Sequence, residues 1–166
     1  MSKLIKDRVL AADNWTLLKE STGPEVLEAV RGKNFIVPLT FWLENTAEIA
    51  LYGGAIGIWL DSDETPSMIN SDLAQIPIIA LNFPVFTDGR SYSSARQLRT
   101  DFSYHGELRA VGDILRDQLY YLSQCGFNSF SLRHDQDPEL CLKAFDDFAT
   151  NYQATVAQPT PLFRRR

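Results

Sequence analysis

Residues 55–60 read Ala-Ile-Gly-Ile-Trp-Leu and residues 78–81 read Ile-Ile-Ala-Leu, with a polar turn and a short helical stretch between them. Near-continuous apolar runs of this length are typical of parallel strands, because helices bury both faces of such a sheet. The two runs begin about 20 residues apart, which suits one strand–helix unit. This stretch therefore predicts an α/β fold with a parallel sheet.

The same alternation of apolar runs and helical patterns continues on both sides of this stretch. Further apolar runs occupy residues 35–39, 108–111 and 127–132, and each is followed by apolar residues at helical spacing. The whole pattern predicts about five strand–helix units over residues 35–152, in a mostly parallel sheet covered by helices. Because five units are too few to close an eight-fold barrel, we expect an open or incomplete, barrel-like sheet.

Capping residues predict where the last two helices begin and end. Asp113 and Asp137 are the expected N-cap residues, and Pro138 takes the first helical position of the last helix. Gly126 is expected to end the helix that Asp113 begins. The last helix is expected to carry an apolar stripe that reaches Tyr152.

The two ends of the chain are less regular than its middle. Residues 1–34 predict two or three short strands around polar turns, as a small antiparallel β flap, followed by a short helix. We expect residues 1–156 to form a single α/β domain. Residues 157–166 contain two prolines and three arginines and are expected to be a flexible tail.

Composition and charge exclude several classes of partner. The chain has 166 residues, of which 45% are hydrophobic and 22% charged, as in a globular domain. Its net charge of −5 argues against nucleic acid and anionic membranes as partners. No apolar segment approaches a membrane span, and no secretory signal is expected. Cys125 and Cys141 are interpreted as reduced packing residues on helices, so a cytoplasmic location is expected.

An arginine-rich segment is the best candidate for a functional site. Ligands of parallel α/β proteins bind beyond the carboxyl ends of the strands, so residues that follow the apolar runs are the ones to consider. Guanidinium groups suit carboxylate, sulfite, sulfate or phosphate, because they donate two parallel hydrogen bonds. No Lys or Arg lies between Lys33 and Arg90, and five Arg without a Lys then fall within 27 positions: Arg90, Arg96, Arg99, Arg109 and Arg116.

The expected oxyanion site centres on Arg90. Asp88, Arg90, Ser91 and Tyr92 form a loop and the start of a helix, with Ser91 as the expected N-cap. Free N–H groups at a helix start also favour an anion. The alternative is that the arginines of this segment are solvated and pair with nearby acids such as Asp101.

Glu107 and Arg109 lie two positions apart on an expected strand and therefore on the same face. A buried charged pair is costly unless its members pair with each other or face a site. Two interpretations stay open: an internal salt bridge, or a pair that faces a cleft at the ligand end of the sheet, with Asp113 as a neighbour.

Arg133 and His134 directly follow the last apolar run. Arg133 is a candidate anion ligand, and His134 is a candidate general acid or base. The sequence contains no dinucleotide-binding, Walker-type or nucleophile-elbow motif and no His/Cys cluster. No catalytic residue, cofactor or metal site is therefore assigned.

The central part of the chain resembles a known bacterial family. Residues 86–93 read Phe-Thr-Asp-Gly-Arg-Ser-Tyr-Ser, and residues 106–113 read Gly-Glu-Leu-Arg-Ala-Val-Gly-Asp. Together with Gly57-Ile58-Trp59-Leu60 and Cys125-Gly126-Phe127, these stretches are similar to the family catalogued as domain of unknown function 934. The resemblance covers roughly residues 35–150. Members of that family are commonly described as oxidoreductases involved in sulfite reduction, because their genes lie beside those of assimilatory sulfite reductase.

The resemblance implies a pathway and leaves the activity open. The first expectation is an accessory protein of assimilatory sulfite reduction that binds a small oxyanion or docks on the sulfite reductase. The second is an oxidoreductase whose cofactor site has no recognisable motif. The third is an enzyme that acts on a phosphorylated or carboxylated metabolite, with His134 or Asp88 as acid or base.

Overall fold

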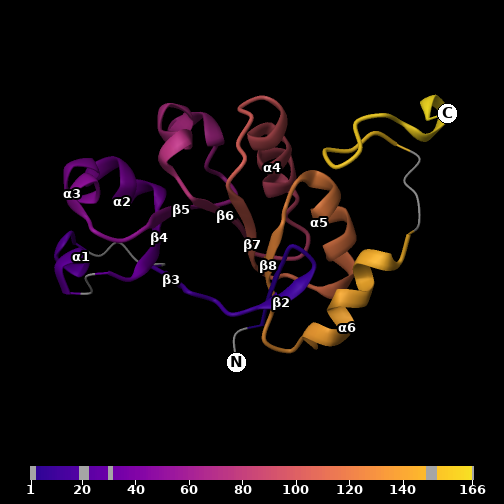
Figure 1. The fold of residues 1–166 in the computed structure, drawn as a ribbon, viewed down its shortest axis with the longest axis horizontal. Coiled ribbons are helices and arrows are strands. Elements are labelled where there is room, and N and C mark those ends of the chain that lie inside the picture. The colour runs from indigo at the N-terminus through magenta and orange to yellow at the C-terminus, as the bar shows by residue number, and fades with distance from the viewer. Residues whose placement is uncertain (1–2, 19–22, 30–31, 149–152, 166) are drawn as a thin grey trace.

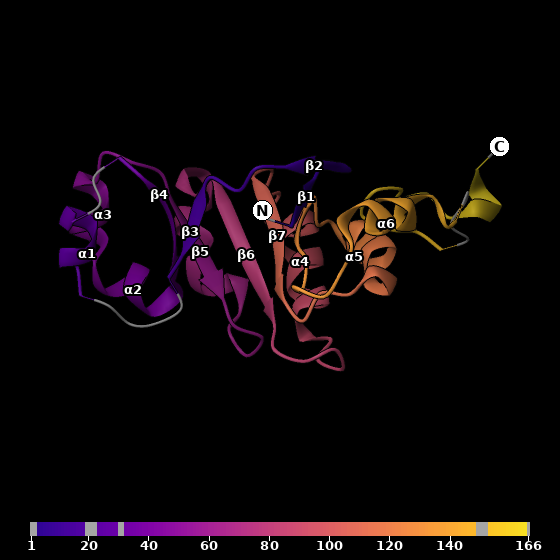
Figure 2. The ribbon, with the colours of Figure 1, turned by 90° about the horizontal axis from the view of Figure 1, so that it is seen from below.

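The computed structural model describes residues 3–18, 23–29, 32–148 and 153–165, which form an α/β fold around one curled, open sheet of eight strands (Figures 1 and 2). The order of strands across the sheet is β2-β1-β8-β7-β6-β5-β4-β3. The strands are β1 (Leu4–Lys6), β2 (Val9–Ala11), β3 (Trp15–Leu17), β4 (Asn34–Pro38), β5 (Ile56–Leu60), β6 (Ile78–Phe83), β7 (Glu107–Gly112) and β8 (Ser129–Ser131).

Short helices fill most of the connections between these strands. The α-helices are α1 (Glu25–Ala29), α2 (Leu39–Glu44), α3 (Thr46–Leu51), α4 (Arg90–Thr100), α5 (Leu119–Cys125) and α6 (Pro138–Leu142). The 3-10 helices are η1 (Pro66–Gln75), η2 (Arg116–Gln118), η3 (Lys143–Asp146) and η4 (Leu162–Arg164). Among the described residues, no helix has the length and apolar character needed to cross a bilayer.

The sheet is larger than the sequence predicted, and it is mixed. Neighbouring strands from β3 to β8 are parallel, whereas β1 runs antiparallel to both β2 and β8. The α/β class and the open, curled form are confirmed, but the prediction of a mostly parallel sheet of about five units is wrong. The additional strands of the sheet are the short N-terminal strands β1, β2 and β3, whose pairing with β8 and β4 is decided by contacts between distant segments and not by a periodic pattern.

The N-terminal strands are present, but they do not form a separate flap. The β1–β2 hairpin extends the sheet beyond β8, and β3 extends it beyond β4 at the opposite edge. The connection between β2 and β3 therefore spans the sheet from edge to edge, as both views show (Figures 1 and 2). This connection brings Asp13 onto one face of the sheet, where it contacts Arg109.

The two faces of the sheet are covered in different ways. Alternate strand residues such as Ile58 and Ile79 face the main core, to which all the α-helices except α3 contribute fully buried or nearly buried side chains. The residues between them face the second side, where the connection from β2 to β3 lies. That side carries a smaller apolar cluster: Ile36, Ile78, Ala80 and Val111, with Trp15, Leu17 and Trp59 packed against it.

Several expected helix boundaries hold and others are wrong. Asp137 caps α6 by accepting hydrogen bonds from two backbone amides, with Pro138 at the first position, and Gly126 ends α5 in the left-handed region at φ +113°. Asp113 is not an N-cap, because its carboxylate binds other partners and η2 begins after Leu115. The last helix breaks into α6 and η3, and Tyr152 lies outside the described residues.

Candidate functional site

The carboxyl ends of the parallel strands form a polar edge, as expected for a parallel α/β sheet. Asp61 follows β5, and its carboxylate accepts a hydrogen bond from Asn82 Nδ2 on β6 at 2.9 Å. Gly112 ends β7 at φ +101°, and its backbone passes so close to β6 that an added Cβ would lie 2.4 Å from the carbonyl oxygen of Phe83. The edge is therefore held by direct contacts between successive strand ends.

Arg90 and Asp88 are brought together at this edge. Arg90 Nε and Nη2 donate to the two oxygens of Asp88 at 3.0 and 2.7 Å, and Nη2 also donates to Ser62 Oγ at 2.8 Å. Hydrogen bonds from the side chain and the backbone amide of Arg90 hold the pKa of Asp88 well below its usual range. The Arg90 guanidinium is therefore already paired on one side with the ionised carboxylate of Asp88.

Ser91 and Tyr92 have packing roles that differ from the expected ones. Gly89 is the N-cap residue of α4, and Ser91 lies within the helix, where its buried hydroxyl donates to the carbonyl of Asn82 at 2.6 Å. The Tyr92 ring packs edge-on against Phe83 with 5.0 Å between centroids, and burial raises the pKa of its phenol. Both residues fix α4 against β6.

A hollow of about 420 Å³ lies beside Arg90. Its lining mixes the guanidinium with hydroxyl groups and with two acidic side chains from the turn after β5. The lining residues are Ser62, Asp63, Glu64, Thr65, Arg90, Ser93, Ser94 and Gln97. Burial raises the pKa of Glu64, although a hydrogen bond from the Asp61 amide opposes the shift. The hollow can take a small polar molecule, but its acidic side chains repel an anion.

Asp113 and Arg133 form a second group at the same edge. Arg133 Nη1 donates to Asp113 Oδ1 at 2.7 Å, and Arg133 Nη2 reaches Asp135 Oδ2 at 2.7 Å. The other oxygen of Asp113 accepts the backbone amide of Phe86 at 2.9 Å. The Arg133 side chain holds the pKa of Asp135 well below its usual range. This group therefore ties the end of β8 to the loop after β6.

We call residues 84–89 the edge loop. The Asp113 carboxylate fixes its backbone at Phe86, and the ion pair with Arg90 fixes its end at Asp88. The side chains of Val85 and Phe86 remain 54% and 52% exposed. Two neighbouring apolar side chains are thus presented to solvent on a backbone that is held from both sides.

Glu107 and Arg109 lie on the second face of the sheet, away from this edge. Arg109 Nη2 donates to Glu107 Oε1 at 2.9 Å, and Arg109 Nη1 donates to Asp13 Oδ1 at 2.9 Å. Lys6 Nζ binds the other oxygen of Glu107 at 2.6 Å. Both charges of the pair are buried and compensated, so the geometry agrees with the first interpretation, an internal salt bridge. The contacts with Asp13 and Lys6 also attach the N-terminal segment to β7.

Arg99, on the same segment, has a structural role inside the protein. Arg99 is not a solvated residue paired with Asp101, because its guanidinium donates to the carbonyls of Tyr104, Gly106 and Gly126 at 2.7–2.9 Å. Sequence reasoning missed this role, since backbone carbonyls leave no trace in a residue pattern.

The candidate anion ligands fall into three groups that share no hydrogen-bond or ion-pair partner among the described residues: Arg90, Arg109 and Arg133 each bind their own acids. His134 is exposed, and its carbonyl accepts a hydrogen bond from Lys3 Nζ. Sequence reasoning missed Asp13 and Lys6, which come from the other end of the chain and are brought in only by the sheet.

The two cysteines are buried and unreactive. Cys125 and Cys141 are buried free thiols on α5 and α6, as predicted, and burial raises the pKa of both. A raised pKa lowers the thiolate fraction and hence the reactivity. Within the described ranges, His, Cys, Asp and Glu side chains do not gather in groups of three that could hold a metal ion.

These features define an α/β protein with a curled, open sheet and a polar edge at the ends of its parallel strands. The model of the family described as "Bacterial protein of unknown function (DUF934)" matches residues 57–163, so the chain belongs to that family. The match includes the edge loop, α4, Asp113 and Arg133. A comparison with curated proteins gives no match.

Proposed function

We propose that this chain is an accessory protein of assimilatory sulfite reduction that docks on the sulfite reductase through its edge loop. The observation that carries the docking part is the exposure of Val85 and Phe86 on a fixed loop backbone. Apolar side chains on a preorganised loop lose little conformational entropy when a partner covers them. The pathway comes from the family resemblance, and the docking element comes from the geometry.

Two ionised carboxylates of the edge are unsuited to general-base catalysis. Asp88 and Asp135 each bind an arginine with both carboxylate oxygens, and their pKa values lie well below the usual range. A general base needs a pKa near the working pH, and these carboxylates are held far from it. Their role is instead to hold the edge loop and its neighbours in one conformation.

The exposed pair of side chains is also a suitable centre for a protein interface. Aromatic residues are enriched among the side chains that contribute most to binding, and a ring of polar residues usually surrounds them. Phe86 has such surroundings, because Thr87, Asp88 and Arg90 follow it and Asp113 lies behind it. Charged residues at the rim orient the partner without the cost of full burial.

Copurification tests this proposal. The tagged chain, expressed in a host that contains the reductase, is expected to retain the reductase, and the Phe86→Asp variant is expected to lose it. Leu140→Asp is the matched control, because Leu140 is also 52% exposed but lies on α6. Equal recovery of the reductase with both variants would contradict the docking role of the loop.

Growth tests the pathway independently of the loop. A strain that lacks the gene is expected to grow slowly with sulfite as its sole sulfur source and normally with cysteine. Normal growth of the deletion strain on sulfite would contradict the role in sulfite reduction.

A small-oxyanion site beside Arg90 is the second candidate function. The hollow of about 420 Å³ and the hydroxyls of Ser62, Ser93 and Ser94 favour it, whereas Asp63 and Glu64 in the same lining oppose it. Sulfite or phosphate that binds the folded state raises its melting temperature in a saturable way. Loss of this protection in Arg90→Ala would support the site, and equal protection of both proteins would exclude Arg90 as the ligand.

The remaining alternatives are an oxidoreductase and a metabolite enzyme. The absorption spectrum of the purified protein separates the first of these from an accessory role, since a bound flavin or haem gives a visible band. Turnover of a phosphorylated or carboxylated metabolite that is lost in Asp88→Asn would favour the second.

A further inference from the structure

Two of the large hydrophobic side chains stand out by their exposure. Leu51 is 88% exposed and Phe163 is 65% exposed, the two highest values for large hydrophobic residues in the part of the chain that the structure describes. They lie at opposite ends of the molecule, with Leu51 on α3 at one end and Phe163 near the end marked C (Figures 1 and 2). Exposed apolar groups of this size mark interaction sites when they gather with suitable neighbours.

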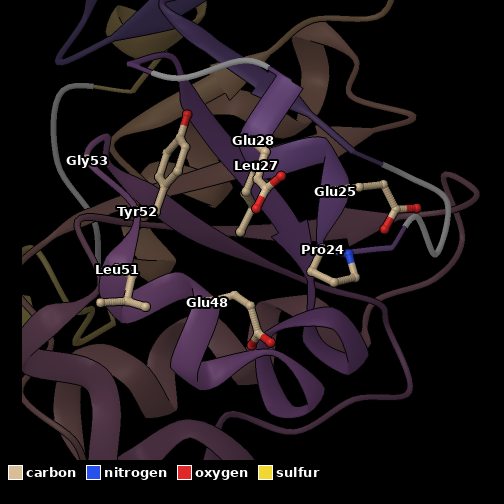
Figure 3. A pocket seen from close by; sticks show the side chains of 8 residues that line it. All are labelled: Pro24, Glu25, Leu27, Glu28, Glu48, Leu51, Tyr52 and Gly53. Carbon is tan, nitrogen blue, oxygen red and sulfur yellow. The ribbon is translucent and has the colours of Figure 1, made fainter.

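Leu51 borders a hollow of about 760 Å³ between α1 and α3. Figure 3 shows the side chains around this hollow, which come from both helices, from Pro24 just before α1 and from the residues after α3. The described residues of the lining combine apolar groups with three acidic side chains, and no basic residue is among them: Pro24, Glu25, Leu27, Glu28, Glu48, Leu51, Tyr52 and Gly53. Such a hollow suits a segment that is both apolar and basic.

We call residues 157–165 the arm. Its base is held on α5, because the Val156 amide donates to the carbonyl of Gln124 at 3.1 Å and Thr155 Oγ1 donates to Gln124 Oε1 at 3.0 Å. Beyond this anchor the arm extends away from the sheet (Figures 1 and 2). Nine residues span at most about 30 Å, which is enough to reach a neighbouring molecule.

The outer part of the arm is apolar and basic. Leu162 and Phe163 form part of η4 and are 40% and 65% exposed. The Arg164 guanidinium lies over the Phe163 ring at 5.6 Å from its centroid, and Arg165 and Arg166 follow in the sequence. Two apolar side chains next to the two arginines of the arm complement the hollow, whose described lining has apolar side chains next to three negative charges.

We infer that the arm of one copy of this chain occupies the hollow between α1 and α3 of a second copy. The occupant comes from another copy because the arm and the hollow lie at opposite ends of the same chain (Figure 1). Phe163 and Leu162 contact the exposed Leu51, and the arginines face the glutamates. Two copies related by a two-fold axis make this contact twice, once with each arm.

The contact is small, so it is sensitive to both its apolar and its charged parts. Interfaces that bury less than about 1,200 Å² are typical of weak complexes, and exposed ion pairs are screened by salt. Association is therefore expected to depend on protein concentration and to weaken as the salt concentration rises.

Sedimentation of single-site variants tests the inference. The parent chain is expected to move from monomer to dimer as its concentration rises. Phe163→Asp changes only the arm and Leu51→Asp changes only the hollow, so each variant alone is expected to remain a monomer under conditions in which the parent is dimeric. Leu140→Asp, with 52% exposure on α6, is the control and is expected to dimerise like the parent.

Mixing the two variants gives the decisive result. Phe163→Asp keeps an intact hollow and Leu51→Asp keeps an intact arm, so an equimolar mixture retains one of the two contacts and is expected to form a heterodimer weaker than the parent dimer. A mixture that stays monomeric, variants that dimerise like the parent, or a parent that is monomeric at every concentration would each overturn the inference.

Discussion

The carboxylate of Asp113 holds the backbone amide of Phe86 at 2.9 Å, across 27 positions of sequence and between the ends of two neighbouring parallel strands. Its other oxygen binds Arg133 at 2.7 Å, so one side chain joins the ends of β7 and β8 to the edge loop. The loop that displays Val85 and Phe86 is therefore supported by the sheet itself.

Removal of the Asp113 carboxylate is expected to loosen the edge loop. In Asp113→Ala, the Phe86 amide loses its acceptor, and the net loss is about 1.5–3 kcal/mol for a hydrogen bond to a charged group. Hydrogen exchange at the Phe86 amide is expected to accelerate, while amides of β6 keep their protection. Asp113→Asn retains a carbonyl oxygen and is expected to exchange more slowly than the alanine variant. Unchanged exchange at Phe86 in both variants would show that the loop does not depend on this bond.

The buried ion pair on β7 is expected to contribute strongly to stability. Arg109→Met leaves the Glu107 carboxylate buried with Lys6 as its remaining charged partner, which costs about 3–5 kcal/mol in the free energy of unfolding. Arg116→Met breaks the exposed pair with Asp147 and is expected to cost less than about 1 kcal/mol. Denaturant unfolding of both variants measures the difference. Equal losses would mean that the burial of Arg109 has no energetic consequence.

The same pair predicts how stability depends on pH. Burial alone would raise the pKa of Glu107 above 4.5, but the hydrogen bond from Lys6 and the charge of Arg109 outweigh burial and lower it. A lowered pKa in the folded state gives stability that is fully present above the unfolded pKa and is lost as the pH falls through the folded pKa. Glu107→Gln is therefore expected to lose stability less steeply than the parent below about pH 4.5. Identical slopes for parent and variant in acid would contradict this assignment.

The close approach of β6 and β7 predicts a glycine requirement. Gly112 has φ +101°, and an added Cβ would lie 2.4 Å from the carbonyl oxygen of Phe83. Gly112→Ala is expected to destabilise the fold by about 1–3 kcal/mol. Gly53→Ala is the control, because nothing lies within 4 Å of its added Cβ, and its effect is expected to stay below about 1 kcal/mol. Thermal unfolding compares the two, and equal melting temperatures would contradict the predicted clash.

The sequence revealed those parts of the fold that repeat. Apolar runs predicted β4 to β8 because each of these strands lies in a rhythm of strand and helix, and Asp137 and Gly126 marked helix ends by local chemistry. β1, β2 and β3 were not placed in the sheet, because the partners of three-residue strands are decided by contacts between distant segments. The places of these three strands at the two edges of the sheet follow from tertiary packing.

The candidate site was predictable in its place but only partly in its connections. Asp88, Arg90, Asp113 and Arg133 all lie at the carboxyl edge that the strand pattern indicated. Their pairing into separate groups was not predictable, because Ser62 and Asp135 contribute through loops whose paths no periodic pattern fixes. The exposure of the Phe86 side chain could not be predicted from the sequence either, since phenylalanine residues are usually buried.

Calorimetric titration of the sulfite reductase with the purified chain tests docking by the edge loop most directly. The parent chain and Leu140→Asp are expected to bind with the same affinity, and Phe86→Asp is expected to bind at least about 10-fold more weakly, as loss of a central aromatic contact does. Saturable binding by the parent with this loss in Phe86→Asp would support the account. No binding by the parent, or equal affinity of Phe86→Asp and the parent, would contradict it.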